Sequence, residues 1–98
     1  MTLKVVFRRA ARAEFDAAAL WYEERQAGLG AQFVSEIDRV IDLASSYPER
    51  FPTQHPGIRR AQARRFPYSL FFHLEAARVV VLAVLHARRD PTIWQSRV

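Results

Sequence analysis

The chain has 98 residues, about half of them apolar and about a quarter charged, so it is long enough for one folded domain and too apolar to be disordered. The absence of cysteine excludes disulfides and thiolate metal sites, and the wide spacing of the three histidines predicts no zinc site. We therefore expect a single domain over residues 1–98 that uses no metal and no cofactor. The apolar runs are too short for a signal peptide or a membrane span, which predicts a cytoplasmic protein without membrane contact.

The charge is unevenly distributed along the chain. Of the formal net charge of +5, residues 1–49 contribute −2 and residues 50–98 contribute +7. Nearly all of the basic residues are arginine, and the single lysine is Lys4. Since a guanidinium group can form two parallel hydrogen bonds to a phosphate or a carboxylate, the second half of the chain predicts contact with an anionic partner. The alternative is a solvated basic surface that binds nothing.

The first half of the chain predicts one short strand and two helices. The strand is expected over residues 2–7, and the helices are expected over residues 10–25 and 31–46. Each helix carries one apolar stripe at helical spacing: Ala11, Phe15, Ala18, Ala19 and Tyr22 in the first, and Phe33, Ile37, Val40, Ile41 and Ala44 in the second. Gly28 is expected to form the C-cap of the first helix. Because the link is so short, the two helices should pair antiparallel.

The second half predicts a connection followed by three strands. Pro48, Pro52 and Pro56-Gly57 indicate an irregular connection over residues 47–57. Strands are expected over residues 58–65, 68–74 and 78–85, with a tight hairpin turn at residues 75–77. The last of these strands is an almost unbroken run of valine and leucine, which is typical of a strand buried on both faces.

This β-α-α-β-β-β order predicts an α+β fold, with an antiparallel helical hairpin packed on one face of a small, mostly antiparallel sheet. In the strand over residues 58–65, one face is expected to carry Arg60, Gln62 and Arg64. The other face is expected to carry Arg59, Ala61, Ala63 and Arg65. One face of the sheet should therefore be partly basic and open to a partner.

The most informative stretch lies in the last twenty residues. His86, Arg88 and Arg89 follow the buried strand directly, and Trp94 comes soon after them. One imidazole and two guanidiniums at the end of a rigid strand predict a site for a phosphate or an acidic partner. The alternatives are structural: His86 holds the tail by a backbone hydrogen bond, and Trp94 is a packing anchor that pins the tail to the helices.

A set of residues spread along nearly the whole chain is informative when it is taken together and in order. They are Ala13, Asp16, Tyr22, Gly30, Phe33 and Pro48 in the helical part, then Arg59, Arg64-Arg65-Phe66-Pro67-Tyr68, Phe71-Phe72 and His86-x-Arg88-Arg89-x-Pro91-x-x-Trp94. In this order the chain resembles the ParE/RelE superfamily of type II toxin–antitoxin toxins, and in particular the ParE-like plasmid stabilisation proteins. The resemblance implies a bacterial growth inhibitor that is neutralised by a cognate antitoxin in a hetero-oligomer and that reaches operator DNA only through that antitoxin.

The resemblance leaves three functions open. ParE-like members poison DNA gyrase, whereas RelE-like members cleave mRNA on the ribosome without a metal. If the chain is such an RNA interferase, the catalytic residues are expected to be His86, Arg64 and Arg88. The ParE-like function is favoured, because the central strands carry no lysine and the aromatic residue near the C-terminus, Trp94, cannot transfer a proton. The third possibility is a non-toxic structural or regulatory family member.

The resemblance and the charge pattern together predict two sets of binding residues. Residues expected to bind the target or a nucleic acid are Arg59, Arg64, Arg65, Arg88, Arg89 and Trp94. Residues expected to bind the antitoxin are Phe15, Trp21, Tyr22, Arg60 and Phe71. Trp21 should be exposed, because it falls outside the apolar stripe of the first helix.

Overall fold

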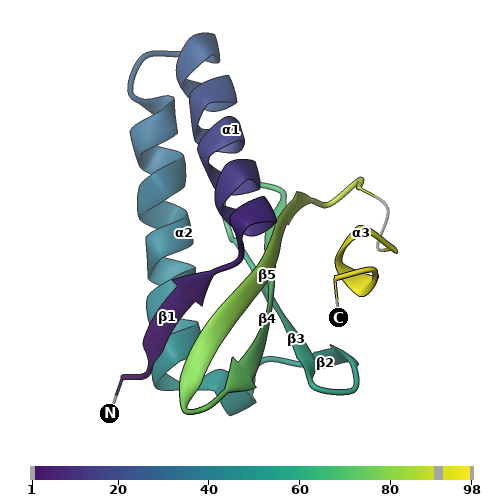
Figure 1. The fold of residues 1–98 in the computed structure, drawn as a ribbon. Helices are drawn as coiled ribbons and strands as arrows, with labels where there is room; N and C mark the ends of the chain where they lie inside the picture. The colour runs from purple at the N-terminus through teal and green to yellow at the C-terminus, as the bar shows by residue number, and fades with distance from the viewer. Residues whose placement is uncertain (1, 90–91, 98) are drawn as a thin grey trace.

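The computed structural model describes residues 2–89 and 92–97. The first half contains β1 (Lys4–Phe7), α1 (Arg9–Arg25), α2 (Leu29–Ser46) and a short 3-10 helix, η1 (Pro48–Arg50). The second half contains β2 (Thr53–His55), β3 (Ile58–Gln62), β4 (Tyr68–Glu75), β5 (Arg78–His86) and α3 (Thr92–Gln95). Figure 1 shows α1 and α2 as a long antiparallel hairpin, with the strands beside its lower half.

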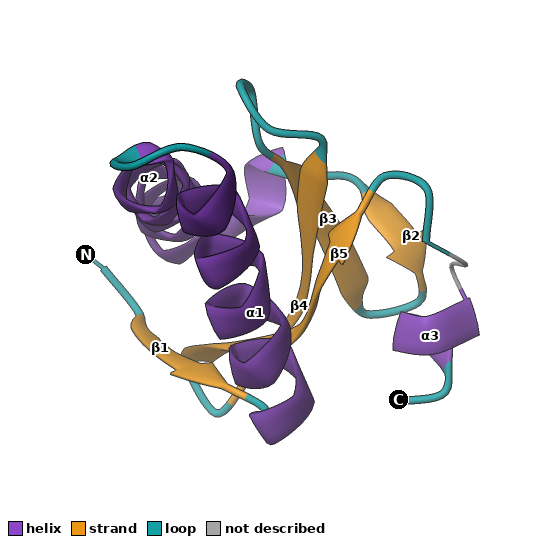
Figure 2. Ribbon diagram, turned by 90° about the horizontal axis from the view of Figure 1, so that it is seen from above, coloured by secondary structure: helices purple, strands orange, loops and turns teal. Residues whose placement is uncertain are grey.

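The strands form one sheet with the order β1-β5-β4-β3-β2. β1 runs parallel to β5, and the other neighbouring strands are antiparallel. The helical hairpin lies against one face of the sheet and α3 lies on the opposite side (Figure 2). The predicted α+β fold with a mostly antiparallel sheet is therefore confirmed.

The turn between α1 and α2 is closed by a carboxylate and a glycine. Glu23 accepts hydrogen bonds from the backbone N–H of Gly28 at 2.9 Å and of Gly30 at 3.0 Å, which are free donors at the start of α2. A Cβ atom on Gly30 would lie only 2.6 Å from the carbonyl oxygen of Ala19, so the two helices approach closely here. The expected role of Gly28 is wrong: Gln26 is the C-cap of α1, and Gly28 precedes α2 with a left-handed φ of 87°.

Two apolar clusters hold the sheet, one on each face. The larger cluster lies between the sheet and the hairpin, and the rings of Phe33 and Tyr68 meet there with 5.1 Å between their centroids. The smaller cluster lies on the α3 side, where the rings of Phe71 and Trp94 stack 5.0 Å apart. β5 contributes side chains to both clusters, which confirms the prediction of a strand buried on both faces. Trp94 packs against the sheet face opposite the helices, so the expectation that it pins the tail to the helices is wrong.

Three elements differ from the predicted ones. The expected irregular connection over residues 47–57 contains η1 and the edge strand β2, which a two-residue Pro56-Gly57 turn joins to β3. Gly57 has the left-handed φ of 81° that this turn requires. β3 ends at Gln62 rather than at residue 65, because the backbone N–H of Arg64 donates to the Glu36 carboxylate at 2.6 Å instead of to a strand. The short helix α3 was not predicted.

Candidate functional site

A groove of about 400 Å³ runs between α1 and the end of β5, and we call it the α1 groove. It is lined by Glu14, Ala17, Ala18, Trp21, Tyr22, Tyr68, Val84, Leu85, His86 and Arg89. Its walls are mostly apolar, and its charged lining residues are Glu14, which is paired with Arg97, and Arg89.

An exposed tryptophan of α1 lines this groove. Trp21 is 49% exposed, which confirms its predicted exposure, and the adjacent Leu20, which does not line the groove, is 60% exposed. The guanidinium of Arg25 lies 4.0 Å from the centre of the Trp21 ring and covers part of it. An exposed aromatic ring on a helix beside a groove is the kind of surface that anchors a protein partner.

Two tyrosines form the inner wall of the α1 groove. Burial raises the pKa of the Tyr22 phenol. Burial also raises the pKa of the Tyr68 phenol, the nearby Tyr22 phenol raises it further, and the Arg89 cation acts in the opposite direction. Both phenols are therefore neutral at pH 7 and can each donate a hydrogen bond to a bound partner.

β5 contains a bulge at the middle of this region. Phe71 pairs with Ala83 and Phe72 pairs with Val81, so Leu82 has no partner residue on β4. Leu82 and Ala83 consequently both belong to the apolar cluster on the α3 side. β1 pairs with β5 only as far as Val81, so the edge of β5 beyond that point has no neighbouring strand.

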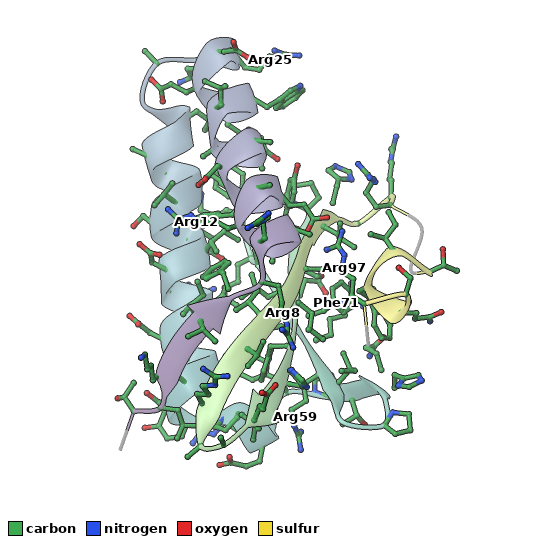
Figure 3. All side chains as sticks on the ribbon, viewed as in Figure 1. Arg8, Arg12, Arg25, Arg59, Phe71 and Arg97 are labelled. Carbon is green, nitrogen blue, oxygen red and sulfur yellow. The ribbon has the colours of Figure 1, made fainter. Side chains whose placement is uncertain are left out.

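An ion pair occupies this open edge of β5. Glu14 on α1 accepts a hydrogen bond from the backbone N–H of Val84 at 3.0 Å, and Arg97 in the C-terminal tail donates to the carbonyl oxygen of Leu82 at 3.0 Å. The two side chains also bind each other, with 2.9 Å between Arg97 Nη2 and Glu14 Oε2. Figure 3 shows Arg97 pointing back from the tail toward the sheet. The pair therefore satisfies backbone groups on the open edge of β5 and links the tail to α1.

Four arginines come together at one end of the sheet, and we call Arg64, Arg65, Arg88 and Arg89 the arginine rim. Arg64 and Arg65 belong to the turn before β4, and the other two belong to the turn after β5. The turns are adjacent, because the backbone N–H of Ala87 donates to the carbonyl oxygen of Pro67 at 2.7 Å. All four side chains are exposed, so this part of the predicted target-binding set forms one cationic surface.

The turn that carries Arg64 is fixed by Glu36, a residue that the sequence analysis did not single out. Glu36 is only 9% exposed, receives two hydrogen bonds of 2.8 Å from Arg39, and accepts one from the Arg64 backbone. The Arg39 hydrogen bonds lower the pKa of this carboxyl group to about 2, against the opposing effect of burial and with further help from the Arg64 N–H. Arg65 is held separately, by a hydrogen bond of 2.6 Å to Gln32.

The other predicted binding residues lie elsewhere. Arg59 donates to the carbonyl oxygen of Phe51 at 2.6 Å and lies near the start of β3, whereas the arginine rim begins beyond the other end of this strand. Phe15 is buried in the larger cluster, while Phe71 and Trp94 are buried against each other on the α3 side. These three rings are at most 9% exposed, so none of them is an exposed anchor for a partner.

A second hollow of about 280 Å³ lies on the α3 side of the sheet, and we call it the α3 pocket. It is lined by Gln54, Arg60, Ser69, Phe71, Leu85, His86, Ala87, Arg89, Trp94 and Gln95. Arg60, which was expected to bind the antitoxin, therefore faces a different hollow from Trp21 and Tyr22.

The three residues proposed for RNA cleavage do not line one hollow. His86 lines both hollows, but neither Arg64 nor Arg88 is among the residues that line either of them. The Nδ1 atom of His86 accepts a hydrogen bond of 3.1 Å from the backbone N–H of Arg88, and its ring packs against the ring of Tyr68. Within residues 2–89 and 92–97, no three acidic or histidine side chains are placed to hold a metal, and no helix is long and apolar enough to cross a membrane.

The comparison with protein families identifies the chain. A family model described as the ParE toxin of the type II toxin-antitoxin system, parDE, matches residues 5–91. The chain belongs to this ParE toxin family. The fold agrees with this result: a solved chain described as "Chromosomal ParDE TA system from P. aeruginosa" has a TM-score of 0.72 and 20% sequence identity, covering 87% of this chain and 96% of that chain. No curated protein sequence matches the chain.

In this ParE-family chain, the sequence identified the arginine rim and the exposed Trp21, but it missed the residues that build their surroundings. Glu14, Glu36 and Arg97 each bind a partner far away in the sequence, and nothing in the local pattern marks them. The only signal was their chemistry, since a partly buried charge normally requires a partner.

Proposed function

We propose that this ParE-family toxin arrests growth by binding DNA gyrase in the cytoplasm, and that a cognate ParD-like antitoxin neutralises it in a hetero-oligomer. The observation that supports this choice is the arginine rim, in which two adjacent turns present four exposed guanidiniums. A cationic surface of this kind suits an acidic protein partner. Metal-free RNA cleavage would need an acid and a base beside the cations, whereas Trp94, the aromatic residue near the C-terminus, is 2% exposed and cannot transfer a proton.

The experiment for the target is inhibition of supercoiling by purified gyrase. We expect the intact chain to inhibit, and a variant with Arg64→Gln and Arg88→Gln to require about tenfold more protein for the same inhibition. The matched control is Arg9→Gln with Arg50→Gln, which removes two exposed guanidiniums outside the rim and should inhibit as the intact chain does. Cleavage of mRNA in a translating extract that disappears in His86→Ala, with no effect on gyrase, would instead establish the RelE-like function. A soluble chain that affects neither process would indicate the non-toxic alternative.

The α1 groove is the proposed docking site for the antitoxin. Its apolar wall and the exposed Trp21 fit the apolar side of an amphipathic helix, and Arg89 in its lining fits an acidic side chain on the same helix. Tyr22 lines the same groove, so we retain Trp21 and Tyr22 in the proposed set of antitoxin-binding residues. Operator DNA is expected to be bound through the antitoxin rather than by this chain.

Calorimetry with the cognate antitoxin tests this docking site. We expect Trp21→Ala to weaken binding by about 2 kcal/mol, because a half-exposed aromatic anchor loses its contact area in the complex. Leu74→Ala is the matched control, since Leu74 is a similarly exposed apolar side chain, at 46%, that does not line the groove. Equal affinities for the two variants would remove Trp21 from the interface.

A further inference from the structure

Four residues that can donate hydrogen bonds lie together in the lining of the α1 groove, and we call Tyr22, Tyr68, His86 and Arg89 the donor cluster. The rings of Tyr22 and Tyr68 lie 6.1 Å apart, and the rings of Tyr68 and His86 lie 5.3 Å apart. Burial raises the pKa of the Tyr68 phenol, and the Arg89 cation is near enough to oppose this effect. The four side chains come from α1, β4, the end of β5 and the turn after it, so the fold rather than the local sequence assembles them.

The phenols and the guanidinium of the donor cluster are not used inside the chain. Tyr22 and Tyr68 are half-buried, and among the described residues no hydrogen bond occupies either hydroxyl group. Arg89 is exposed, and no carboxylate of a described residue forms an ion pair with it. These three groups are therefore available to donate to a ligand.

His86 adds a fourth donor without adding a charge. Its Nδ1 atom accepts a hydrogen bond of 3.1 Å from the backbone N–H of Arg88. Because a ring nitrogen that accepts a hydrogen bond carries no proton, the neutral imidazole has its proton on Nε2. The backbone thus selects the tautomer in which Nε2 is the donor.

The carboxylate of the groove itself is already engaged. Among the described lining residues only Glu14 carries one, and it binds Arg97 at 2.9 Å and the backbone N–H of Val84 at 3.0 Å. The donor cluster therefore offers one positive charge and three neutral donors to a ligand from outside the chain. An ionised carboxylate has one negative charge and about four acceptor positions, which matches this set, whereas a terminal phosphate carries close to two negative charges.

We propose that the donor cluster binds a carboxylate, and that this carboxylate is an acidic side chain of the antitoxin helix in the α1 groove. The inference rests on the proposed docking of the antitoxin and deepens it. The cluster makes the interface selective for an acidic residue at one position of the helix, whereas Trp21 supplies only apolar contact area.

A row of rings sets the position of that acidic residue. The row starts at the exposed Trp21 and continues through Tyr22 and Tyr68 to His86, with successive centroids 5.1, 6.1 and 5.3 Å apart. An α-helix rises 5.4 Å per turn. The acidic residue should therefore lie within about three turns of the apolar residue that covers Trp21.

Calorimetry with the cognate antitoxin tests the carboxylate site. Tyr68→Phe removes only a hydroxyl group and should weaken binding about tenfold, because a hydrogen bond to a charged group is lost. Arg89→Gln should weaken binding at least as much, and since Arg89 is exposed, this variant tests the site even if Tyr68→Phe disturbs the fold. The matched controls are Tyr47→Phe and Arg9→Gln, which change an exposed phenol and an exposed guanidinium outside the groove and should leave the affinity unchanged.

A double-mutant cycle identifies the acidic side chain. Each Asp and Glu of the antitoxin helix is changed to Asn or Gln, and each variant is titrated with the intact chain and with Tyr68→Phe. We expect one acidic position whose replacement removes most of the affinity difference between these two chains. The absence of any coupled position, or equal affinities of Tyr68→Phe and Tyr47→Phe for the intact antitoxin, would overturn the proposal.

The result is separable from that of the docking site. If Trp21→Ala weakens antitoxin binding and neither Tyr68→Phe nor Arg89→Gln does, the docking site stands and the carboxylate site is wrong. If none of these variants weakens binding, both are wrong. Nucleic-acid binding that is lost in Tyr68→Phe, with unchanged antitoxin affinity, would assign the donor cluster to a phosphate backbone and contradict the proposal.

Discussion

The buried carboxylate of Glu36 gives the sharpest stability prediction. Its pKa is about 2 in the folded chain and 4.5 without these contacts, a difference that corresponds to about 3 kcal/mol. Its partner Arg39 is about a third exposed, and solvent there screens the interaction. We therefore expect the ionised carboxylate to contribute about 2–3 kcal/mol to the free energy of unfolding. Replacing Glu36 with glutamine keeps the shape and removes the charge, so Glu36→Gln should lower the free energy of unfolding by that amount at pH 7.

The pH dependence follows from the direction of the shift. A carboxyl group with a lowered pKa stabilises the fold fully above pH 4.5, and this stabilisation is lost as the pH falls toward 2. The difference between the intact chain and Glu36→Gln in urea unfolding should therefore fall to less than half of its pH 7 value by about pH 3. Asp38→Asn, an exposed carboxylate on the same helix, should change stability by less than about 0.5 kcal/mol. An equal effect of Glu36→Gln at both pH values would refute the electrostatic explanation.

Three further predictions concern the fold. Gly30→Ala should destabilise the chain by about 2 kcal/mol in thermal or urea unfolding, since the new Cβ would lie 2.6 Å from a backbone oxygen of α1, and an unchanged stability would mean that the helices separate freely. Ala77→Gly should stabilise the hairpin between β4 and β5 by about 0.5–1 kcal/mol, because Ala77 has a left-handed φ of 60°; a loss of stability would contradict this. Arg97→Ala should cost about 1–2 kcal/mol of stability, because it removes the ion-pair partner of Glu14. Since Glu14 accepts from the Val84 amide, hydrogen exchange of that amide should become faster. Unchanged exchange would show that the ion pair does not protect this edge.

Much of the fold follows from patterns that extend over many residues. The apolar stripes of α1 and α2 and the apolar run of β5 are long, and burial of such patterns leaves few possible arrangements. By contrast, β2 has three residues, all exposed, between two prolines, and its only signal was the Pro56-Gly57 turn. α3 has four residues and is held by Trp94 and the partly buried Ile93 rather than by a long periodic face.

The functional surfaces also differ in whether the sequence could predict them. The arginine rim was predictable because its members are adjacent pairs at the ends of predicted strands. The α3 pocket was not, because it combines Arg60 and Ser69 with Trp94, which approaches from the far end of the chain. The bulge at Leu82 also escapes sequence patterns, since it depends on the pairing of β4 with β5.

The central claim is that this ParE-family toxin acts on gyrase, and induced expression of the chain alone in bacteria tests it most directly. DNA synthesis and protein synthesis are followed in parallel by pulse labelling after induction. The proposed function predicts that DNA synthesis stops first, with filamentous cells and double-strand breaks, and that co-expression of the cognate antitoxin prevents this. Protein synthesis stopping first, or unimpaired growth with the folded chain present, would contradict it.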